Sequence, residues 1–178
     1  MNKISLCNEV ISGREDATNS FDAQCTLAAD LGYDGLEVAP FTLCKQPEDL
    51  SAQDRKKILQ TSKSRGIEIT SLHWLLVSPD GLSITTLDSE IWKNTLGVIK
   101  ATIDLCSDLE GSVLVHGSPK QRIIPSDKSA YEAKQRALDI WYSAGSYAQE
   151  RGVTYCIEPL ARNETSFINT LEEAMSIV

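Results

Sequence analysis

The sequence predicts an α/β fold in which helices cover a parallel sheet. Five short apolar segments rich in β-branched residues recur along the chain and alternate with stretches of helical periodicity. The same junction, a helix end followed by glycine and an apolar strand, recurs at "LGYDGLEV", "RGIEI" and "RGVTY". Alternating strands and helices indicate a parallel sheet, because parallel strands need long crossover connections. The predicted strands are Lys3–Cys7, Gly35–Val38, Ile67–Leu72, Ser112–His116 and Val153–Glu158.

The segments between these strands contain capping residues and apolar faces that are typical of helices. Ser51 followed by Asp54 predicts an N-cap pair, and that helix is expected to close at Arg65 and Gly66. Near the end of the chain, Asn169 followed by Glu172 predicts the start of another helix. Two long helices are marked by apolar faces, one made by Trp92, Leu96, Ile99, Ile103 and Cys106, the other by Ala137, Trp141, Ala144 and Ala148.

The number of units decides between two architectures. Five strand–helix units use all 178 residues, whereas a closed (β/α)₈ barrel needs on the order of 250 residues. The last stretch, "LEEAMSIV", ends without a glycine or a cationic turn. We therefore predict an incomplete barrel, in which residues 1–178 form one domain made of the first five units. The alternative is a complete five-stranded doubly wound domain.

Composition excludes several classes of function. The net charge is −8 and no cluster of Lys and Arg forms a basic stripe, which argues against nucleic acid as a partner. No apolar run reaches membrane-spanning length, and the N-terminus lacks the apolar core of a signal peptide. The five cysteines show no CxxC pairing. Reduced thiols in a cytoplasmic protein are the expectation.

Polar or aromatic residues lie at the carboxyl ends of most of the predicted strands. Glu37 ends the second strand, His73 and Trp74 follow the third, and His116 ends the fourth. In parallel α/β barrels the chemistry gathers at the carboxyl ends of the strands. Both histidines of the chain lie at such ends. We therefore expect these side chains to contribute to a binding site, although each alone could serve the core or a loop.

Glu158 carries the strongest signal. It follows a run of apolar residues and precedes Pro159, which biases its backbone toward the extended conformation at the strand tip. A carboxylate held there needs a cation, a hydrogen-bond donor or a substrate. Glu164, six residues on, either returns to the same site or lies in solvent. Other nearby charges, namely Glu9, Lys120 and Arg122, are expected to be ordinary loop or surface residues.

Four stretches resemble a known family: "GYDGLEVAPF", "SLHWLLVSPDGL", "VLVHGSPKQR" and "IEPLARNETSFINT". They are similar to the xylose isomerase-like TIM barrels, which include sugar phosphate isomerases and epimerases, ketose 3-epimerases and hydroxypyruvate isomerases. The similarity covers essentially the whole chain. It implies a sugar or sugar phosphate isomerase or epimerase that moves a proton next to a carbonyl through an enediolate.

The resemblance also implies a site. Such proteins bind one divalent metal, with ligands from strands five to eight, and Glu158 matches the first of them. The implied metal is Mn²⁺ or Mg²⁺, with Co²⁺ or Zn²⁺ also compatible. Glu158 would also serve as one of the two acid/base carboxylates. Glu164 matches a position that contacts substrate, and His73, Trp74 and His116 would line the pocket. The remaining ligands have no counterpart in these 178 residues.

Two other functions stay open at this point. On the same barrel, a zinc phosphodiesterase resembling endonuclease IV would use His73, His116 and Glu158 as zinc ligands. Alternatively, an inactive barrel fragment would act as a scaffold. Its open sheet edges would then pair with another chain, which includes pairing into a homo-oligomer.

Overall fold

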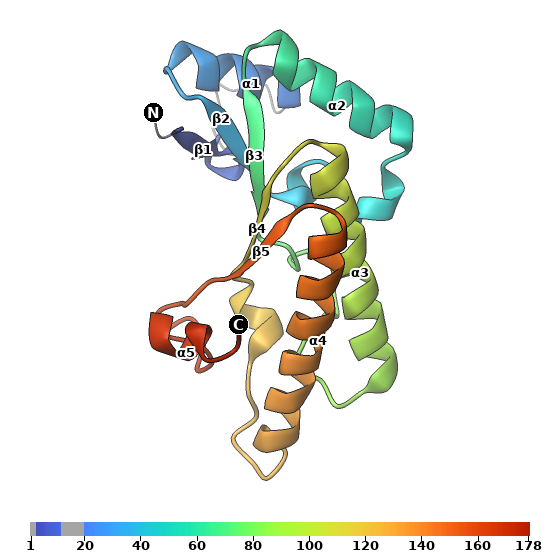
Figure 1. Cartoon of the computed structure of the whole chain (residues 1–178), viewed down its shortest axis with the longest axis vertical. Helices are drawn as coiled ribbons and strands as arrows, with labels where there is room; N and C mark the ends of the chain where they lie inside the picture. Colours follow the sequence, from blue (N-terminus) through green and yellow to red (C-terminus); the bar gives the residue numbers. More distant parts are fainter. Residues whose placement is uncertain (1–2, 12–19) are drawn as a thin grey trace.

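The computed structural model describes residues 3–11 and 20–178, and it contains a parallel sheet of five strands (Figure 1). The strands lie side by side in the order β1-β2-β3-β4-β5, the order in which they occur along the chain. The predicted strands are confirmed, with ends that differ by two residues at most. Their bounds are β1 Ser5–Cys7, β2 Gly35–Val38, β3 Glu68–His73, β4 Val113–His116 and β5 Thr154–Ile157.

The helices pack on the sheet one after another. Each of the first four contacts the strand that follows it, and α1, α2, α3 and α4 contact one another in sequence. A doubly wound sheet requires a point where the strand order reverses, and this sheet has none. The alternative of a doubly wound domain is therefore wrong, and the arrangement is that of an incomplete barrel. The helices are α1 Phe21–Asp30, α2 Ala52–Ser64, α3 Ser89–Asp108, α4 Ala130–Glu150 and the short α5 Leu171–Met175.

The helix starts follow from local side-chain chemistry. The Ser51–Asp54 capping box is confirmed, since the Asp54 N–H donates to Ser51 Oγ (3.2 Å) and the Ser51 N–H donates to Asp54 Oδ2 (3.1 Å). The prediction that Asn169 starts the last helix is wrong by one residue. Thr170 is the N-cap, and its Oγ1 accepts from the Glu173 N–H (3.2 Å).

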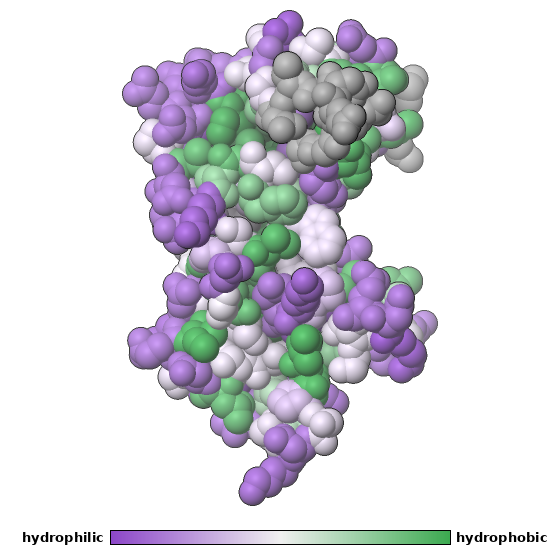
Figure 2. All heavy atoms as spheres, turned by 180° about the vertical axis from the view of Figure 1, so that it is seen from behind, coloured by the Kyte–Doolittle hydropathy of each residue, from purple (hydrophilic) through white to green (hydrophobic). Residues whose placement is uncertain are grey.

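The core lies between the sheet and the helices. Leu36, Leu72 and Leu114 are fully buried on this side of the sheet, opposite apolar residues of α3 and α4 such as Ile103 and Ile140. Because side chains alternate along a strand, their neighbours point to the opposite face of the sheet, where several are polar. On the face shown in Figure 2, apolar and hydrophilic residues are interspersed. Within the described residues, no helix is both long and apolar enough to span a bilayer.

Short 3₁₀ turns follow three of the strands and carry the loops at the carboxyl edge of the sheet. They are η1 Asn8–Val10 after β1, η2 Pro40–Thr42 after β2 and η4 Pro119–Arg122 after β4; a fourth turn, η3 Pro47–Asp49, precedes α2. Asn8 ties two of these loops together. It is fully buried, its Nδ2 donates to Gln24 Oε1 (3.0 Å) and Thr42 Oγ1 (2.7 Å), and its Oδ1 accepts from the Ala39 N–H (2.7 Å). These hydrogen bonds hold the loops in place at the carboxyl edge of the sheet, where the candidate site lies.

Candidate functional site

A cavity of about 330 Å³ opens at the carboxyl edge of the sheet. Five of the six predicted site residues line it, so the structure brings together groups from β2, β3 and β5 that are far apart in the sequence. His116 is the exception. The lining residues are Cys7, Glu9, Glu37, His73, Trp74, Val115, Gly117, Ser118, Pro119, Glu158, Leu160 and Glu164.

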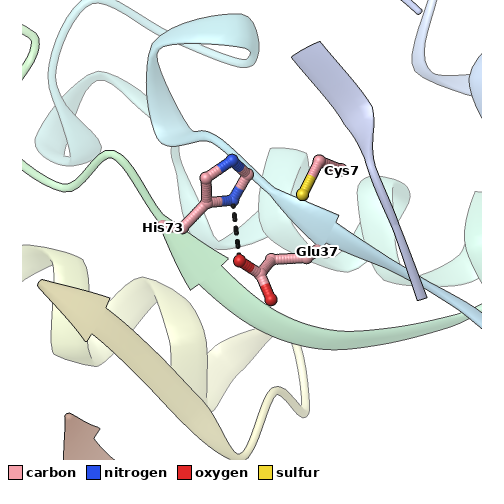
Figure 3. Close-up of side chains that lie close together, drawn as sticks. All are labelled: Cys7, Glu37 and His73. Atoms are coloured by element: carbon pink, nitrogen blue, oxygen red, sulfur yellow. Dashed lines mark ion pairs between the residues drawn. The ribbon is translucent and has the colours of Figure 1, made fainter. Parts of the chain in front are cut away.

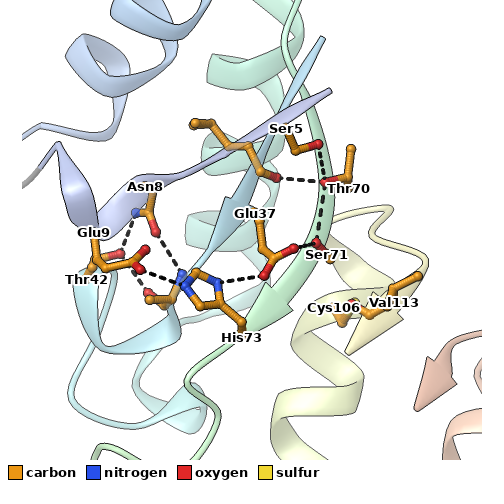
Figure 4. Close-up of polar contacts among 12 residues, drawn as sticks. Ser5, Asn8, Glu9, Glu37, Thr42, Thr70, Ser71, His73, Cys106 and Val113 are labelled. Carbon is orange, nitrogen blue, oxygen red and sulfur yellow. Dashed lines mark hydrogen bonds and ion pairs between the residues drawn. The ribbon is translucent and has the colours of Figure 1, made fainter. Parts of the chain in front are cut away.

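One wall of the cavity is a polar cluster at the ends of the first three strands (Figure 4). His73 Nε2 lies 2.9 Å from Glu9 Oε1, and His73 Nδ1 lies 3.4 Å from Glu37 Oε1. The Ser71 hydroxyl donates to Glu37 Oε2 (2.7 Å). The register pairs Cys7 with Glu37 and Glu37 with Ser71, so these side chains share the face of the sheet opposite the core.

Glu9 lines the cavity, although its sequence context predicts an ordinary loop residue. It lies in η1, two residues after β1 ends, and its carboxylate meets His73 across the cavity wall. In the sequence, the feature that could have indicated its place at the cavity is its position shortly after a strand end. Around the same cluster, burial and the charges of Glu37, Glu9 and Glu158 raise the pKa of the Cys7 thiol to about 11.

Glu158 stands where β5 ends. The strand stops at Ile157, but the Glu158 N–H still donates to the His116 carbonyl (3.2 Å), so the residue continues the pairing with β4. Partial burial raises the pKa of its carboxyl group, and Glu37 and Glu164 add to this, whereas Arg122 opposes it. Glu158 thus lines the cavity from the tip of the strand.

Gly117 makes room for that carboxylate. A Cβ built at Gly117 would lie 2.3 Å from Glu158 Oε2, closer than any side-chain contact allows. The glycine is therefore required by close approach and not by its backbone angles. The position of the Glu158 carboxylate depends on the absence of a side chain in the β4 loop.

Trp74 contributes an aromatic surface to the cavity from a strained backbone. Its φ is 52°, in the left-handed region that bulky residues rarely adopt, and 39% of the residue is exposed. The following turn is attached to the β4 loop, because the Leu76 N–H donates to Ser118 Oγ (3.2 Å). The geometry that holds the ring at the cavity is thus built by two loops.

Glu164 reaches the cavity from the loop after β5. Its Oε2 accepts from the Ala161 N–H (3.2 Å). The same loop is tied together by Asn169, whose side-chain amide donates to the carbonyls of Leu160 (2.8 Å) and Thr165 (2.9 Å). Asn169 therefore orders the loop that presents Glu164, instead of capping a helix.

Arg122 contradicts the expectation of a surface charge, whereas Lys120 is exposed as expected. Arg122 is fully buried, and none of its guanidinium nitrogens has a hydrogen-bond partner in the described part of the chain. Burial lowers its pKa, and the charges of Glu158 and Glu164 act in the opposite direction. The Arg122 guanidinium therefore interacts electrostatically with Glu158 and Glu164, two carboxylates of the cavity.

His116 lies on the other side of the sheet, so the expectation that it lines the cavity is corrected. It is fully buried, with its Nδ1 2.6 Å from the Tyr155 hydroxyl and 3.1 Å from Trp141 Nε1, which donates to it. Its side chain follows the alternation of β4, in which Val115 faces the cavity and His116 faces α4. A zinc site made of His73, His116 and Glu158 is not assembled.

The burial of His116 predicts a pH-dependent stability. Burial, with a smaller contribution from Arg122, lowers its pKa from 6.5 to about 3. Below pH 6.5 the unfolded chain binds a proton that the folded chain does not, so this contribution to stability falls as the pH drops from 6.5 toward about 3. In urea titrations, His116→Asn is expected to reduce the slope of unfolding free energy with pH by up to about 1.4 kcal/mol per unit. An unchanged slope would contradict this assignment.

Comparison with known proteins agrees with this arrangement. The family model described as "Xylose isomerase-like TIM barrel" matches residues 25–178, which is most of the chain. The chain belongs to this family. Among curated proteins, none matches it by sequence.

Solved structures similar to this family member include sugar epimerases. An L-ribulose 3-epimerase superposes with a TM-score of 0.79 at 18% identity, over 100% of this chain and 56% of the other. D-psicose 3-epimerase from Clostridium cellulolyticum, solved with D-tagatose, gives 0.77 at 19% identity, over 99% and 58%. A 3-keto-D-glucoside 4-epimerase from E. coli gives 0.75 at 18% identity, over 99% and 63%. The chain thus spans little more than half the length of these structures, and the likeness establishes the fold.

Proposed function

We propose that the cavity is the substrate site of a sugar or sugar phosphate isomerase or epimerase, whose activity belongs to the whole barrel. One observation carries the proposal: the Glu158 carboxylate, predicted from the sequence, lines the same cavity as Glu37, His73, Trp74 and Glu164. The similarity to ketose 3-epimerases of the same fold supports a sugar as the ligand. A carboxylate-rich cavity beside an aromatic ring has the polar and apolar surfaces that a sugar needs.

The residues of the chain divide into binding and proton-transfer roles. Glu37, His73 and Glu164 offer acceptors and donors for hydroxyl groups, and Trp74 offers an aromatic face for the C–H surface of a sugar. Glu158 is assigned the proton transfer next to the carbonyl. A carboxylate within hydrogen-bond reach of that proton can accept it as a general base.

A divalent metal fits the charge of the site. Glu9, Glu37, Glu158 and Glu164 line one small cavity, and carboxylate oxygens are ligands for a hard cation such as Mn²⁺ or Mg²⁺, with Co²⁺ or Zn²⁺ also compatible. We assign Glu158 as the ligand that this chain supplies for it. Such an ion would stabilise negative charge on the substrate's oxygens. The endonuclease-like zinc site is not favoured, because His116 faces α4.

Trp74 allows sugar binding to be measured on the chain itself. Of the three tryptophans, Trp74 lines the cavity, whereas Trp92 and Trp141 contact other helices and aromatic groups. We expect a ketohexose to change the intrinsic fluorescence in a saturable manner, because the ring passes from water to a sugar surface. Trp74→Phe is expected to remove most of this change. A response of the same size in Trp74→Phe, with Trp92→Phe as the matched control, would place the ligand elsewhere.

A further inference from the structure

Three potential metal ligands converge beside the cavity at a place that the proposed function does not assign to a metal. Cys7, Glu37 and His73 each offer one ligand atom, and these atoms lie within 4.8 Å of one another. Figure 3 shows the sulfur, the carboxylate and the imidazole ring drawn together from three neighbouring strands. Cys7 ends β1, Glu37 lies in β2 and His73 ends β3, so the sheet itself sets their spacing.

The spacing of the nitrogen and oxygen atoms suits a bound ion. His73 Nδ1 lies 3.4 Å from Glu37 Oε1, longer than a good hydrogen bond. Two ligand atoms at about 2.1 Å from a tetrahedral Zn²⁺ lie about 3.4 Å apart. The pair is therefore separated as two ligands of one ion would be, and the Cys7 sulfur lies within 4.8 Å of both.

The surroundings already orient both of these ligands. The Glu9 carboxylate lies 2.9 Å from His73 Nε2, and since an ionised carboxylate is only an acceptor, this contact favours the tautomer with the proton on Nε2. In the neutral ring this leaves the lone pair of Nδ1 facing Glu37. The Ser71 hydroxyl holds the other oxygen of Glu37 (2.7 Å). A carboxylate on the far nitrogen of a ligating histidine is the usual outer contact of protein zinc sites.

We propose that Cys7, Glu37 and His73 bind a Zn²⁺-class divalent ion, separate from the metal assigned to Glu158. One sulfur, one nitrogen and one oxygen form a borderline-soft set that suits zinc or cobalt better than magnesium. Three protein ligands leave one tetrahedral position for water or substrate, as in catalytic zinc sites. Because all three residues line the cavity, that position opens toward it. With this ion bound, Glu37 and His73 would contact a sugar through the ion and not by direct hydrogen bonds to its hydroxyl groups. Only this contact with a sugar oxygen depends on the proposed function.

The alternative is a doubly protonated His73 that satisfies Glu9 and Glu37 without any ion. Cobalt separates the two, because thiolate coordination to Co²⁺ produces a charge-transfer absorption band that an imidazolium cannot produce. We expect metal-free protein titrated with Co²⁺ to show this band, with an intensity that corresponds to one thiolate–Co²⁺ bond per chain, and to lose the band when Zn²⁺ is added. Absence of the band in the wild-type chain would overturn the proposal.

Variants assign the ligands. Cys7→Ser is expected to abolish the band, whereas Cys44→Ser, which changes a cysteine outside the cavity, should keep it. Glu9→Gln is expected to weaken Co²⁺ binding by about 10- to 100-fold through the outer contact to His73. Circular dichroism confirms folding, and if Cys7→Ser does not fold, His73→Asn replaces it. Persistence of the band in folded Cys7→Ser would refute the site.

The cobalt titration tests the zinc site separately from the proposed sugar chemistry. Glu158→Gln is expected to leave the cobalt band unchanged, because Glu158 is not among the three ligands. A chain that shows the band without any sugar activity would retain the zinc site and lose the proposed function. A chain with sugar activity but no thiolate band would retain the proposed function and lose the zinc site.

Discussion

Replacing Glu158 with glutamine is expected to lower turnover of the whole protein by about 10²- to 10⁴-fold, the usual contribution of a positioned general base. The amide has nearly the same shape as the carboxyl group but cannot accept the proton. The measurement is the exchange of substrate hydrogen with D₂O next to the carbonyl of a ketose, followed by NMR. It reports proton abstraction directly, whether or not the product is released.

The matched control is Glu150→Gln, which removes the same charge at the exposed end of α4. We expect its exchange rate to equal that of the wild type. Exchange at the wild-type rate in folded Glu158→Gln would refute the role assigned to Glu158 and leave only a binding function for the cavity.

Gly117→Ala is expected to lower turnover by roughly 10²-fold, the effect of displacing a reacting group by about 1 Å. The new methyl group would lie 2.3 Å from Glu158 Oε2, so the carboxylate must move. Because that oxygen is the far end of a flexible side chain, we expect the unfolding free energy to fall by only about 1 kcal/mol or less. The signature is a large loss of turnover with a small loss of stability, measured by exchange in D₂O and by urea unfolding.

Gly97→Ala provides the control for this substitution. A Cβ at Gly97, inside α3, meets no atom within 4 Å, so alanine there should stabilise the helix by about 0.5–1 kcal/mol and leave turnover unchanged. If Gly117→Ala were as active as Gly97→Ala, the position of the Glu158 carboxylate would not matter for the reaction.

The fold could be predicted because its signals are local. Alternating apolar runs, glycines after helices and the Ser51 capping box depend on neighbouring residues, and all appear in the structure. The convergence of Glu37, His73 and Glu158 could also be predicted, since the carboxyl ends of parallel strands share one edge. The sequence leaves open whether Glu164 returns to the site or lies in solvent. In the structure, hydrogen bonds order its loop and Glu164 lines the cavity.

The wrong predictions share a physical cause, which is that the direction of a side chain depends on distant residues. His116 ends a strand as His73 does, yet the alternation along β4 turns it toward Trp141 and Tyr155. Arg122 follows a loop proline, where a cation is normally solvated, but the turn η4 buries it near Glu158. Neither outcome is encoded in the neighbouring sequence.

The central claim is that a sugar binds at the carboxyl edge of the sheet beside Glu158. A crystal structure of the protein with a ketohexose tests it most directly. We predict ligand density within the cavity, with a hydroxyl or carbonyl oxygen within hydrogen-bonding reach of the groups at the ends of β3 and β5 and with the Trp74 ring against the sugar. Density instead in the groove beside Trp141 and Val178, with the cavity filled only by water, would contradict the account.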